Sequence, residues 1–193
     1  MSHRGPARKV DALQLLKRDH DSLNRLFREF ERLLEGPCDF DGKAELAGRI
    51  CSEMSVHADI EDELFYPAVQ AVVGCDTLLD LDSFDHGVAR SLIARLDEME
   101  PEDDGYDETV ITLGVCTVAH MRDEEARMFE RVRQAGLDTA LLGGQMLRRQ
   151  RALRADVTRV GLPDSRRGGA VWPQACRYGG GHNAATPARR SEH

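Results

Sequence analysis

The chain of 193 residues is long enough for one domain with appendages, and its 41% hydrophobic share can fill a single core, but no stretch approaches the roughly 18 to 20 consecutive apolar residues of a membrane-spanning helix. Five cysteines, odd in number and without a Cys-x-x-Cys pair, argue against a disulfide framework and against a thiolate zinc site. The net charge of −8 is unevenly spread, since residues 137–193 hold ten arginines and four acidic residues, and the acidic remainder disfavours nucleic-acid binding.

The predicted elements are four helices, at about 10–35, 41–73, 77–100 and 107–135. Glycine and proline residues break the helical period between them. No segment alternates β-branched and polar residues over a useful length, so the expected fold class is all-α. The expected helix caps are Asp41, Thr77 and Asp107.

Each predicted helix carries one apolar stripe at steps of three and four residues, and each stripe includes a histidine. A polar side chain on a buried face needs a partner, so these histidines are the first candidates for function. The stripes are Leu13, Leu16, His20, Leu23, Phe27, Phe30 and Leu34 in the first helix, Leu46, Ile50, Met54, His57, Glu61, Leu64 and Ala68 in the second, Leu79, His86, Ala89, Ile93 and Leu96 in the third, and Val110, Leu113, Thr117, His120, Glu124, Met128 and Arg131 in the fourth.

The segments outside residues 10–136 are predicted to be appendages of the helical domain. Residues 137–160 favour one or two short helices, because Gly143 and Gly144 interrupt the apolar pattern. Residues 1–9 and the basic, Gly- and Pro-rich residues 161–193 are expected to be disordered. The N-terminal residues lack the apolar segment of a signal peptide, so a cytoplasmic location is expected.

Two segments carry the same His-x-x-x-Glu motif. A spacing of four places the imidazole and the carboxylate on one helical face, one turn apart, within reach of one metal cluster. The helix before each motif holds one further histidine in its apolar stripe. The candidate metal ligands are therefore His20, His57, Glu61, His86, His120 and Glu124.

A metal centre explains this set better than ordinary core packing does. One buried histidine is readily satisfied by a hydrogen bond, but four inward histidines with two inward glutamates would leave costly buried charges. Imidazoles and carboxylates suit iron, manganese or zinc, and two carboxylates able to bridge favour two ions over one. The alternative is an internal network of salt bridges and hydrogen bonds without metal.

The order His, His-x-x-x-Glu, His, His-x-x-x-Glu resembles the hemerythrin-like proteins with an HHE cation-binding domain, over about residues 11–135. The run Glu63-Leu64-Phe65-Tyr66-Pro67 is also similar to that family. The resemblance implies an up-down-up-down four-helix bundle around a non-haem centre of two irons per chain. It further implies that Glu61 and Glu124 bridge the irons, with His20 and His57 on one iron and His86 and His120 on the other.

The sequence departs from the oxygen-carrying hemerythrins at Arg90. In those proteins the third helix supplies two histidines four residues apart, and Arg90 stands four residues after His86. One imidazole fewer argues against simple reversible oxygen transport and favours reactions at positions left open on the metals. Glu63 and Tyr66 are candidates for additional ligands, although Tyr66 equally fits a packing residue whose hydroxyl bonds a site carboxylate. Arg90 either pairs with a carboxylate near the site or extends its charge to solvent.

Two functional interpretations follow from the sequence. The first is a di-iron protein that binds, senses or reacts with oxygen, peroxide or nitric oxide. The second is a non-catalytic module that responds to iron or oxygen and passes the signal to a protein partner through its basic tail. In both, the expected ligand is a small diatomic molecule or peroxide, and neither a nucleic acid nor a membrane is an expected partner.

Overall fold

The computed structural model describes residues 10–74 and 76–160, and every regular element in those ranges is a helix. The all-α prediction is confirmed. The disorder expected for residues 1–9 and 161–193 concerns segments outside the described residues. None of the helices in the described part combines the length and the apolar character needed to cross a membrane.

The helices follow the predicted order. The first and third predicted helices are α1 (Ala12–Leu34) and α4 (Asp76–Leu96). The second and fourth are each divided by a π turn, in which a backbone N–H bonds to the carbonyl five residues before it. The second consists of α2 (Phe40–Ile60), the π turn η1 (Glu61–Phe65) and α3 (Tyr66–Val73). The fourth consists of α5 (Tyr106–Asp123), the π turn η2 (Glu124–Met128) and α6 (Phe129–Ala135), and it is followed by α7 (Thr139–Val160).

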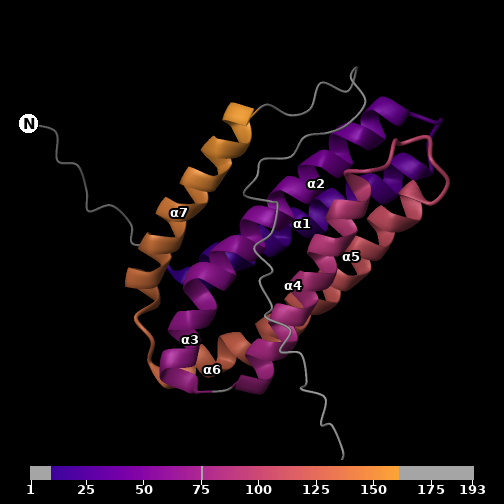
Figure 1. The fold of residues 1–193 in the computed structure, drawn as a ribbon. Coiled ribbons are helices and arrows are strands. Elements are labelled where there is room, and N and C mark those ends of the chain that lie inside the picture. Colours follow the sequence, from indigo (N-terminus) through magenta and orange to yellow (C-terminus); the bar gives the residue numbers. More distant parts are fainter. Residues whose placement is uncertain (1–9, 75, 161–193) are drawn as a thin grey trace, which may run out of the picture.

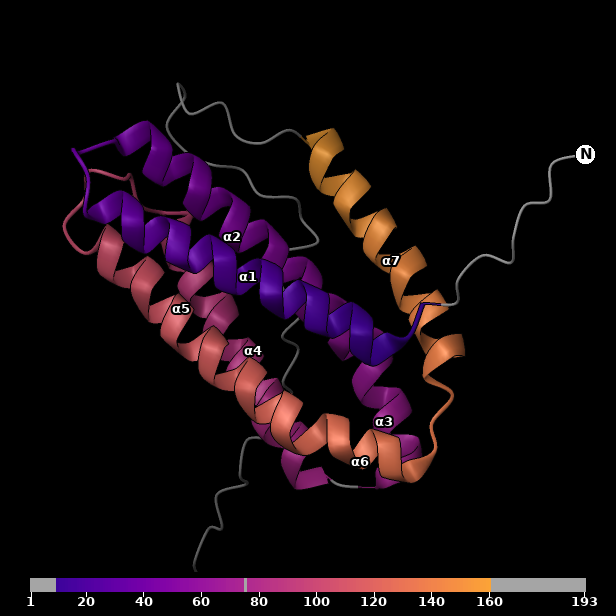
Figure 2. The same ribbon diagram turned by 180° about the vertical axis from the view of Figure 1, so that it is seen from behind.

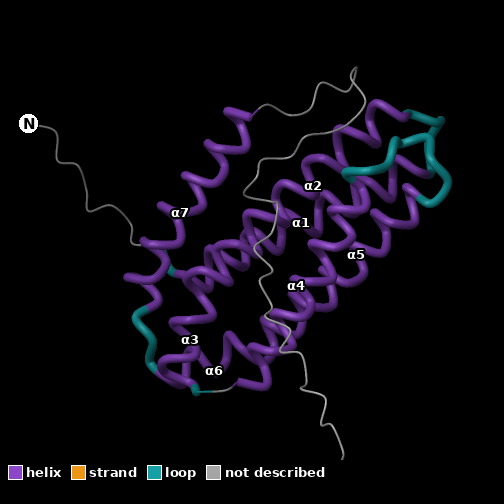
Figure 3. The backbone as a smooth tube through the Cα atoms, viewed as in Figure 1, coloured by secondary structure: helices purple, strands orange, loops and turns teal. Residues whose placement is uncertain are grey.

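The four long helices α1, α2, α4 and α5 lie side by side and alternate in direction, which is the expected four-helix bundle (Figure 1, Figure 2). The connections from α1 to α2 and from α4 to α5 lie at one end of the bundle (Figure 3). At the other end α3 packs against α6. From there α7 runs back along the outside of the bundle and packs on α1 and α2.

The apolar core has two parts. One is built around Leu23, Phe30 and Leu113 in the long section of the bundle. The other lies where α7 joins the bundle and includes Leu16 and Met146. On α1 the two parts are separated by residues 17–22, and this stretch holds His20. Burying a large apolar side chain stabilises a fold by about 1.5–3 kcal/mol, so packing on both sides keeps the intervening polar layer in place.

The π turn η1 changes the buried face of the second helix. The sequence predicts Leu64 and Ala68 on that face, but both are only partly buried, and Phe65 and Val69 are buried in their place. A π turn contains one more residue than an α turn, so every later residue moves one position around the helix. The predicted stripe is therefore wrong beyond Glu61, by one residue.

The fourth helix has the same one-residue displacement. Arg131, predicted to continue the stripe, is exposed, and Val132 is fully buried. Met128, the last residue of η2, is buried as predicted, and the displacement affects the residues that follow this π turn. Apolar periodicity assumes a constant helical repeat, and both π turns violate it at the site.

Two of the expected caps differ in the structure. Asp39 caps α2, since its carboxylate accepts a hydrogen bond from the Gly42 N–H at 2.9 Å, and Asp41 lies in the first turn. Gly105, with φ of 90°, precedes α5 in a left-handed conformation that favours glycine. Asp107 lies in the first turn of α5 and pairs with Lys43 at 2.6 Å. The side chain of Thr77 lies outside the described part of the chain.

The segment after Gly136 forms one continuous helix of 22 residues where one or two short helices were predicted. Leu142, Met146 and Leu153 on one face of α7 are buried against the second part of the core. Gly143 and Gly144 lie inside α7 without breaking it. Tertiary packing of the apolar face outweighs the weak helix propensity of the two glycines.

Candidate metal centre

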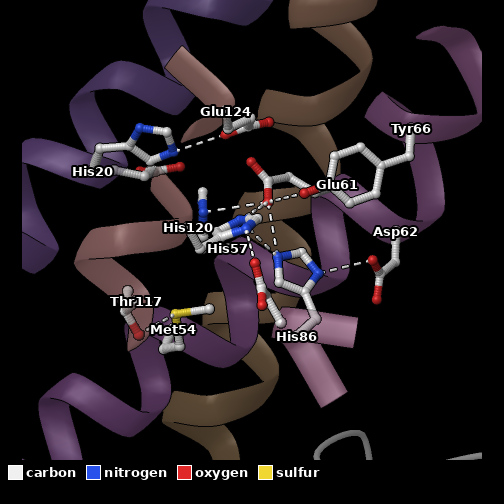
Figure 4. A network of polar contacts seen from close by, with 12 residues as sticks. His20, Met54, His57, Glu61, Asp62, Tyr66, His86, Thr117, His120 and Glu124 are labelled. Carbon is white, nitrogen blue, oxygen red and sulfur yellow. Dashed lines mark hydrogen bonds and ion pairs between the residues drawn. The ribbon is translucent and has the colours of Figure 1, made fainter. Parts of the chain in front are cut away.

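The structure brings the six predicted ligand residues together inside the bundle (Figure 4). Each is at most 3% exposed. The two glutamates are the first residues of the π turns. The six residues are His20 on α1, His57 on α2, Glu61 on η1, His86 on α4, His120 on α5 and Glu124 on η2.

Two groups of three ligating atoms share Glu61. One group contains His20, His57 and Glu61, the other contains Glu61, His86 and His120, and within each group the three atoms lie within 4.8 Å of one another. A spacing of this size is what three ligands around one cation require. The histidines divide between the groups as the resemblance implies, and their role as ligands stays a prediction.

The Glu61 carboxylate is the centre of this arrangement. Its Oε2 atom lies 3.3 Å from His57 Nε2, 3.2 Å from His86 Nε2 and 3.8 Å from His120 Nε2. Tyr66 donates a hydrogen bond to the same oxygen at 3.2 Å. One fully buried carboxylate therefore contacts a histidine from each of α2, α4 and α5.

Glu124 lies on the other side of the cluster, beside α1. Its Oε2 atom is 3.2 Å from His20 Nε2. Among the described residues, Glu124 enters neither of the two three-atom groups. The two glutamates, equivalent in the sequence motif, are thus placed differently in the structure.

Several buried polar atoms of this cluster make no hydrogen bond. They include Oε1 of Glu61 and the Nε2 atoms of His20 and His57, which lie within ion-pair distance of a glutamate oxygen but without the geometry of a hydrogen bond. A buried polar atom without a partner costs free energy, and native proteins seldom leave one unsatisfied. A cation coordinated by imidazole nitrogens and carboxylate oxygens would satisfy them, so the residues present fit a metal centre.

The protonation of the two central histidines differs. Burial lowers the pKa of His57 to about 3, which keeps its imidazole neutral and available to a metal. Burial opposes protonation of His86 too, but hydrogen bonds with Asp62 and Glu61 outweigh it and raise the pKa to about 10. Burial raises the pKa of Glu61, but its electrostatic interaction with the neighbouring His57 ring and its hydrogen bonds with His120 and His86 outweigh burial and lower that pKa well below its usual value.

Two carboxylates that the sequence did not single out contact the Nδ1 atoms of His86 and His20, the ring nitrogens that face away from the glutamates of the cluster. Asp62 Oδ1 is 2.9 Å from His86 Nδ1, and Glu125 Oε1 is 2.8 Å from His20 Nδ1. Each of these acids directly follows the glutamate of a His-x-x-x-Glu motif, and that repetition is the signal that could have found them. Carboxylates in this position fix the ring orientation and tautomer of a metal-binding histidine.

Arg90 pairs with acidic residues near the site, which is one of the two roles expected for it. Its Nη2 atom lies 2.7 Å from Asp62 and 3.3 Å from Asp59. The guanidinium therefore does not take the place of the missing imidazole. It binds the carboxylate that orients His86.

Of the two additional candidates, Tyr66 is near the cluster and Glu63 is not. Tyr66 has the second role expected for it, since its hydroxyl bonds Glu61 and its ring packs in the core. Glu63 forms two short hydrogen bonds with Arg149 of α7, at 2.6 and 2.7 Å, and its side chain is 43% exposed. It lies outside the cluster, and the expectation of a ligand at Glu63 is not supported.

An open groove of about 1150 Å³ runs beside the His20 side of the cluster, between the start of α1 and α6. Lys17, Glu125 and Phe129 line it. Glu125 bonds His20, and the Phe129 ring stacks on the His20 ring at 5.9 Å between centroids. Two residues that contact His20 therefore also line the groove.

A family model that covers most of the chain identifies the kind of domain. Residues 11–132 match the family described as hemerythrin HHE cation binding domain. The chain is similar in structure to an HHE cation binding domain-containing protein from Mycobacterium kansasii, an Rv2633c homolog, with a TM-score of 0.68, 22% identity, and 81% of this chain and 95% of that chain covered. It is also 25% identical over 119 residues to a protein of Nostoc sp. named DNA nickase, covering 62% of this chain and 32% of that relative. The chain thus spans about a third of the relative's length.

Proposed function

Because this chain belongs to the hemerythrin HHE cation-binding domain family, we propose that its buried cluster binds two iron ions and that the protein binds, senses or reacts with oxygen, peroxide or nitric oxide there. The observation that carries the proposal is the pair of three-atom groups that share Glu61. Two groups with one carboxylate in common suit two neighbouring cations better than one.

The donor set supports iron as the metal. Four imidazoles and two carboxylates are ligands that iron, manganese and zinc accept, and the family resemblance favours iron among them. Iron held by these residues would supply redox chemistry toward oxygen species at coordination positions that the six side chains leave open.

The residues around the cluster have supporting roles in this proposal. Apolar packing above and below, including Met54 and Phe65, excludes bulk water from the carboxylates and imidazoles. Tyr66 fixes the position of one Glu61 oxygen by donating a hydrogen bond to it. Asp62 and Glu125 orient His86 and His20. These contacts fix the ligand atoms before a metal arrives, which lowers the cost of assembling the site.

A second candidate function is a non-catalytic module that responds to iron or oxygen, and the position of α7 favours it. Gln150 of α7 donates a hydrogen bond at 2.6 Å to Asp19, the neighbour of His20. Arg149 of α7 binds Glu63, two residues after Glu61. α7 therefore contacts residues that are one and two positions away from the predicted ligands His20 and Glu61, and a change at the metals would be passed to α7 through them. A measurable rate of peroxide consumption by iron-loaded protein, lost in His120→Ala, favours the reactive function over this one.

The proposal predicts about two irons per chain, because the ligating atoms form two three-atom groups that have only Glu61 in common. Elemental analysis after anaerobic loading with Fe²⁺ and removal of free metal measures the content. Air oxidation should then give near-ultraviolet absorption bands typical of a bridged iron pair. A content of one iron or less per chain after full loading would contradict the dinuclear site.

A further inference from the structure

The second π turn and the helix before it repeat the first, position by position. Each has a histidine, then the glutamate of the cluster, then a second acid, then an aromatic residue directly after the turn. The matching pairs are His57 and His120, Glu61 and Glu124, Asp62 and Glu125, and Tyr66 and Phe129. The cluster therefore consists of two halves built on one plan.

The second acid of each half serves a histidine of another helix in the same way. Asp62 lies 2.9 Å from Nδ1 of His86, and Glu125 lies 2.8 Å from Nδ1 of His20. In both cases the contact leaves Nε2 directed at a glutamate of the cluster, His86 Nε2 at 3.2 Å from Glu61 and His20 Nε2 at 3.2 Å from Glu124. The aromatic residues repeat this, since Tyr66 stacks on His86 and Phe129 stacks on His20.

The two halves differ in the cation that pairs with the second acid. Asp62 is held by the Arg90 guanidinium at 2.7 Å, and both side chains are 31% exposed. Arg90 is fixed further by Asp59. Because this ion pair is half-buried, water and salt screen it only weakly. The guanidinium, held by two acids, therefore keeps Asp62 in one orientation.

Glu125 has a weaker support. Its cation is Lys17, which lies 3.1 Å away, is 48% exposed and also contacts the exposed Asp21 at 3.0 Å. An exposed lysine shared between two acids contributes little to holding either, because water and salt screen the pair. Glu125 is therefore freer to reorient than Asp62.

The aromatic position breaks the repeat a second time. Tyr66 donates its hydroxyl to Glu61 at 3.2 Å, whereas Phe129 has no hydroxyl to offer. Glu61 belongs to both three-atom groups, so this hydrogen bond supports both metal positions, and the difference between the positions rests on how firmly their imidazoles are held. The half that contains His20 gains only ring packing from its aromatic residue.

We propose that Asp62 and Glu125 are matched positioning residues, one for each metal, and that the different cations paired with them, Arg90 and Lys17, make the metal positions unequal. The position between His86 and His120 binds its ion first and more tightly, and the position between His20 and His57 fills second and releases its ion first. The inference rests on the proposed function, since it requires two metals per chain.

The physical reason is orientation. A carboxylate on the far nitrogen fixes the ring and the tautomer of a metal-binding histidine, and loss of such a partner typically lowers metal affinity about 10- to 100-fold. A carboxylate that is itself mobile orients its histidine less firmly, so the metal has to fix the ring when it binds and the affinity is lower. Unequal support of Asp62 and Glu125 therefore becomes unequal affinity.

The test is an anaerobic titration with Fe²⁺ against a competing chelator, which resolves the two binding steps. The wild-type protein should bind in two steps. Asp62→Asn, which keeps the side-chain shape, should weaken the tighter step by about 10-fold or more, and Glu125→Gln should weaken only the looser step. Asp62→Glu, which restores a carboxylate like the one in the other half, should recover most of the affinity that Asp62→Asn loses.

The controls remove neighbouring carboxylates that touch no imidazole. Glu63→Gln breaks the pair with Arg149, and Asp123→Asn breaks the pair with Arg127. Both should leave the two steps unchanged, and circular dichroism of each metal-free variant checks that the helices are intact. Two steps of equal affinity, or an equal effect of Asp62→Asn and Glu125→Gln on both steps, would overturn the inference and leave the dinuclear site standing. A wild-type protein that binds one ion or none contradicts the proposed function itself.

Discussion

Glu61→Ala is expected to reduce the iron content from about two ions per chain to well below one, the largest loss from any single substitution in the cluster. Glu61 is the carboxylate that both three-atom groups share, and it is fully buried. Its removal takes a ligand from both metals and also leaves two adjacent cations without the negative charge between them. Elemental analysis after anaerobic loading measures the effect.

Glu124→Ala is the matched comparison, because the two glutamates hold the same place in the repeated motif. Glu124 lies beside His20 and belongs to neither three-atom group among the described residues, so its loss should remove about one ion and spare the other. Helix content by circular dichroism separates loss of metal from loss of fold. Equal losses in the two variants would mean that both carboxylates bridge, as the family resemblance implies for this pair.

Periodicity and spacing were enough to predict the helices and the cluster. The stripe of α1 is buried as predicted up to Phe30, and the four inward histidines with the two motif glutamates meet in one layer. This worked because an amphipathic helix has to bury its stripe, and four stripes that each contain a histidine have to bring those histidines together. Polar residues within an apolar stripe are therefore informative without any knowledge of the tertiary structure.

The sequence did not reveal the π turns. A π turn occurs where tertiary contacts compensate for a poorer local hydrogen-bond pattern, and local propensity carries no sign of that compensation. The consequence was an error of one position beyond each motif, which assigned Ala68 and Arg131 to the buried face where Val69 and Val132 belong.

The residues around the ligands were harder to predict. Glu63 was a candidate for an additional ligand because Arg90 stands where a further histidine would be, whereas its carboxylate reaches outward to Arg149 of α7. The role of Asp62 depends on a contact with His86, a residue far along the chain. Contacts between helices of this kind follow from packing, and one sequence without a structure does not contain them.

The second large expected effect concerns Gly143, where α7 crosses the start of α1. A Cβ atom added there would lie 2.3 Å from the carbonyl oxygen of Val10, 2.6 Å from the backbone nitrogen of Ala12 and 2.7 Å from the carbonyl carbon of Asp11. All three are backbone atoms, which cannot move away from the new methyl group as the end of a flexible side chain can. Gly143→Ala should lower the free energy of unfolding by about 3 kcal/mol, which corresponds to a fall in Tm of roughly 6–12 °C for a chain of this size.

Gly144→Ala provides a control from the next residue of the same helix. A Cβ there would meet only the end of the flexible Arg148 side chain, at 3.8 Å, so the change should raise stability by about 0.5–1 kcal/mol through helix propensity alone. Opposite signs for two adjacent glycines would separate close packing from propensity. Because α7 contributes none of the six predicted ligands, the Gly143→Ala protein should still bind metal at temperatures where it is folded. A Tm that falls by the same amount in both variants, or in neither, would mean that α7 does not pack on the start of α1 as closely as these distances require.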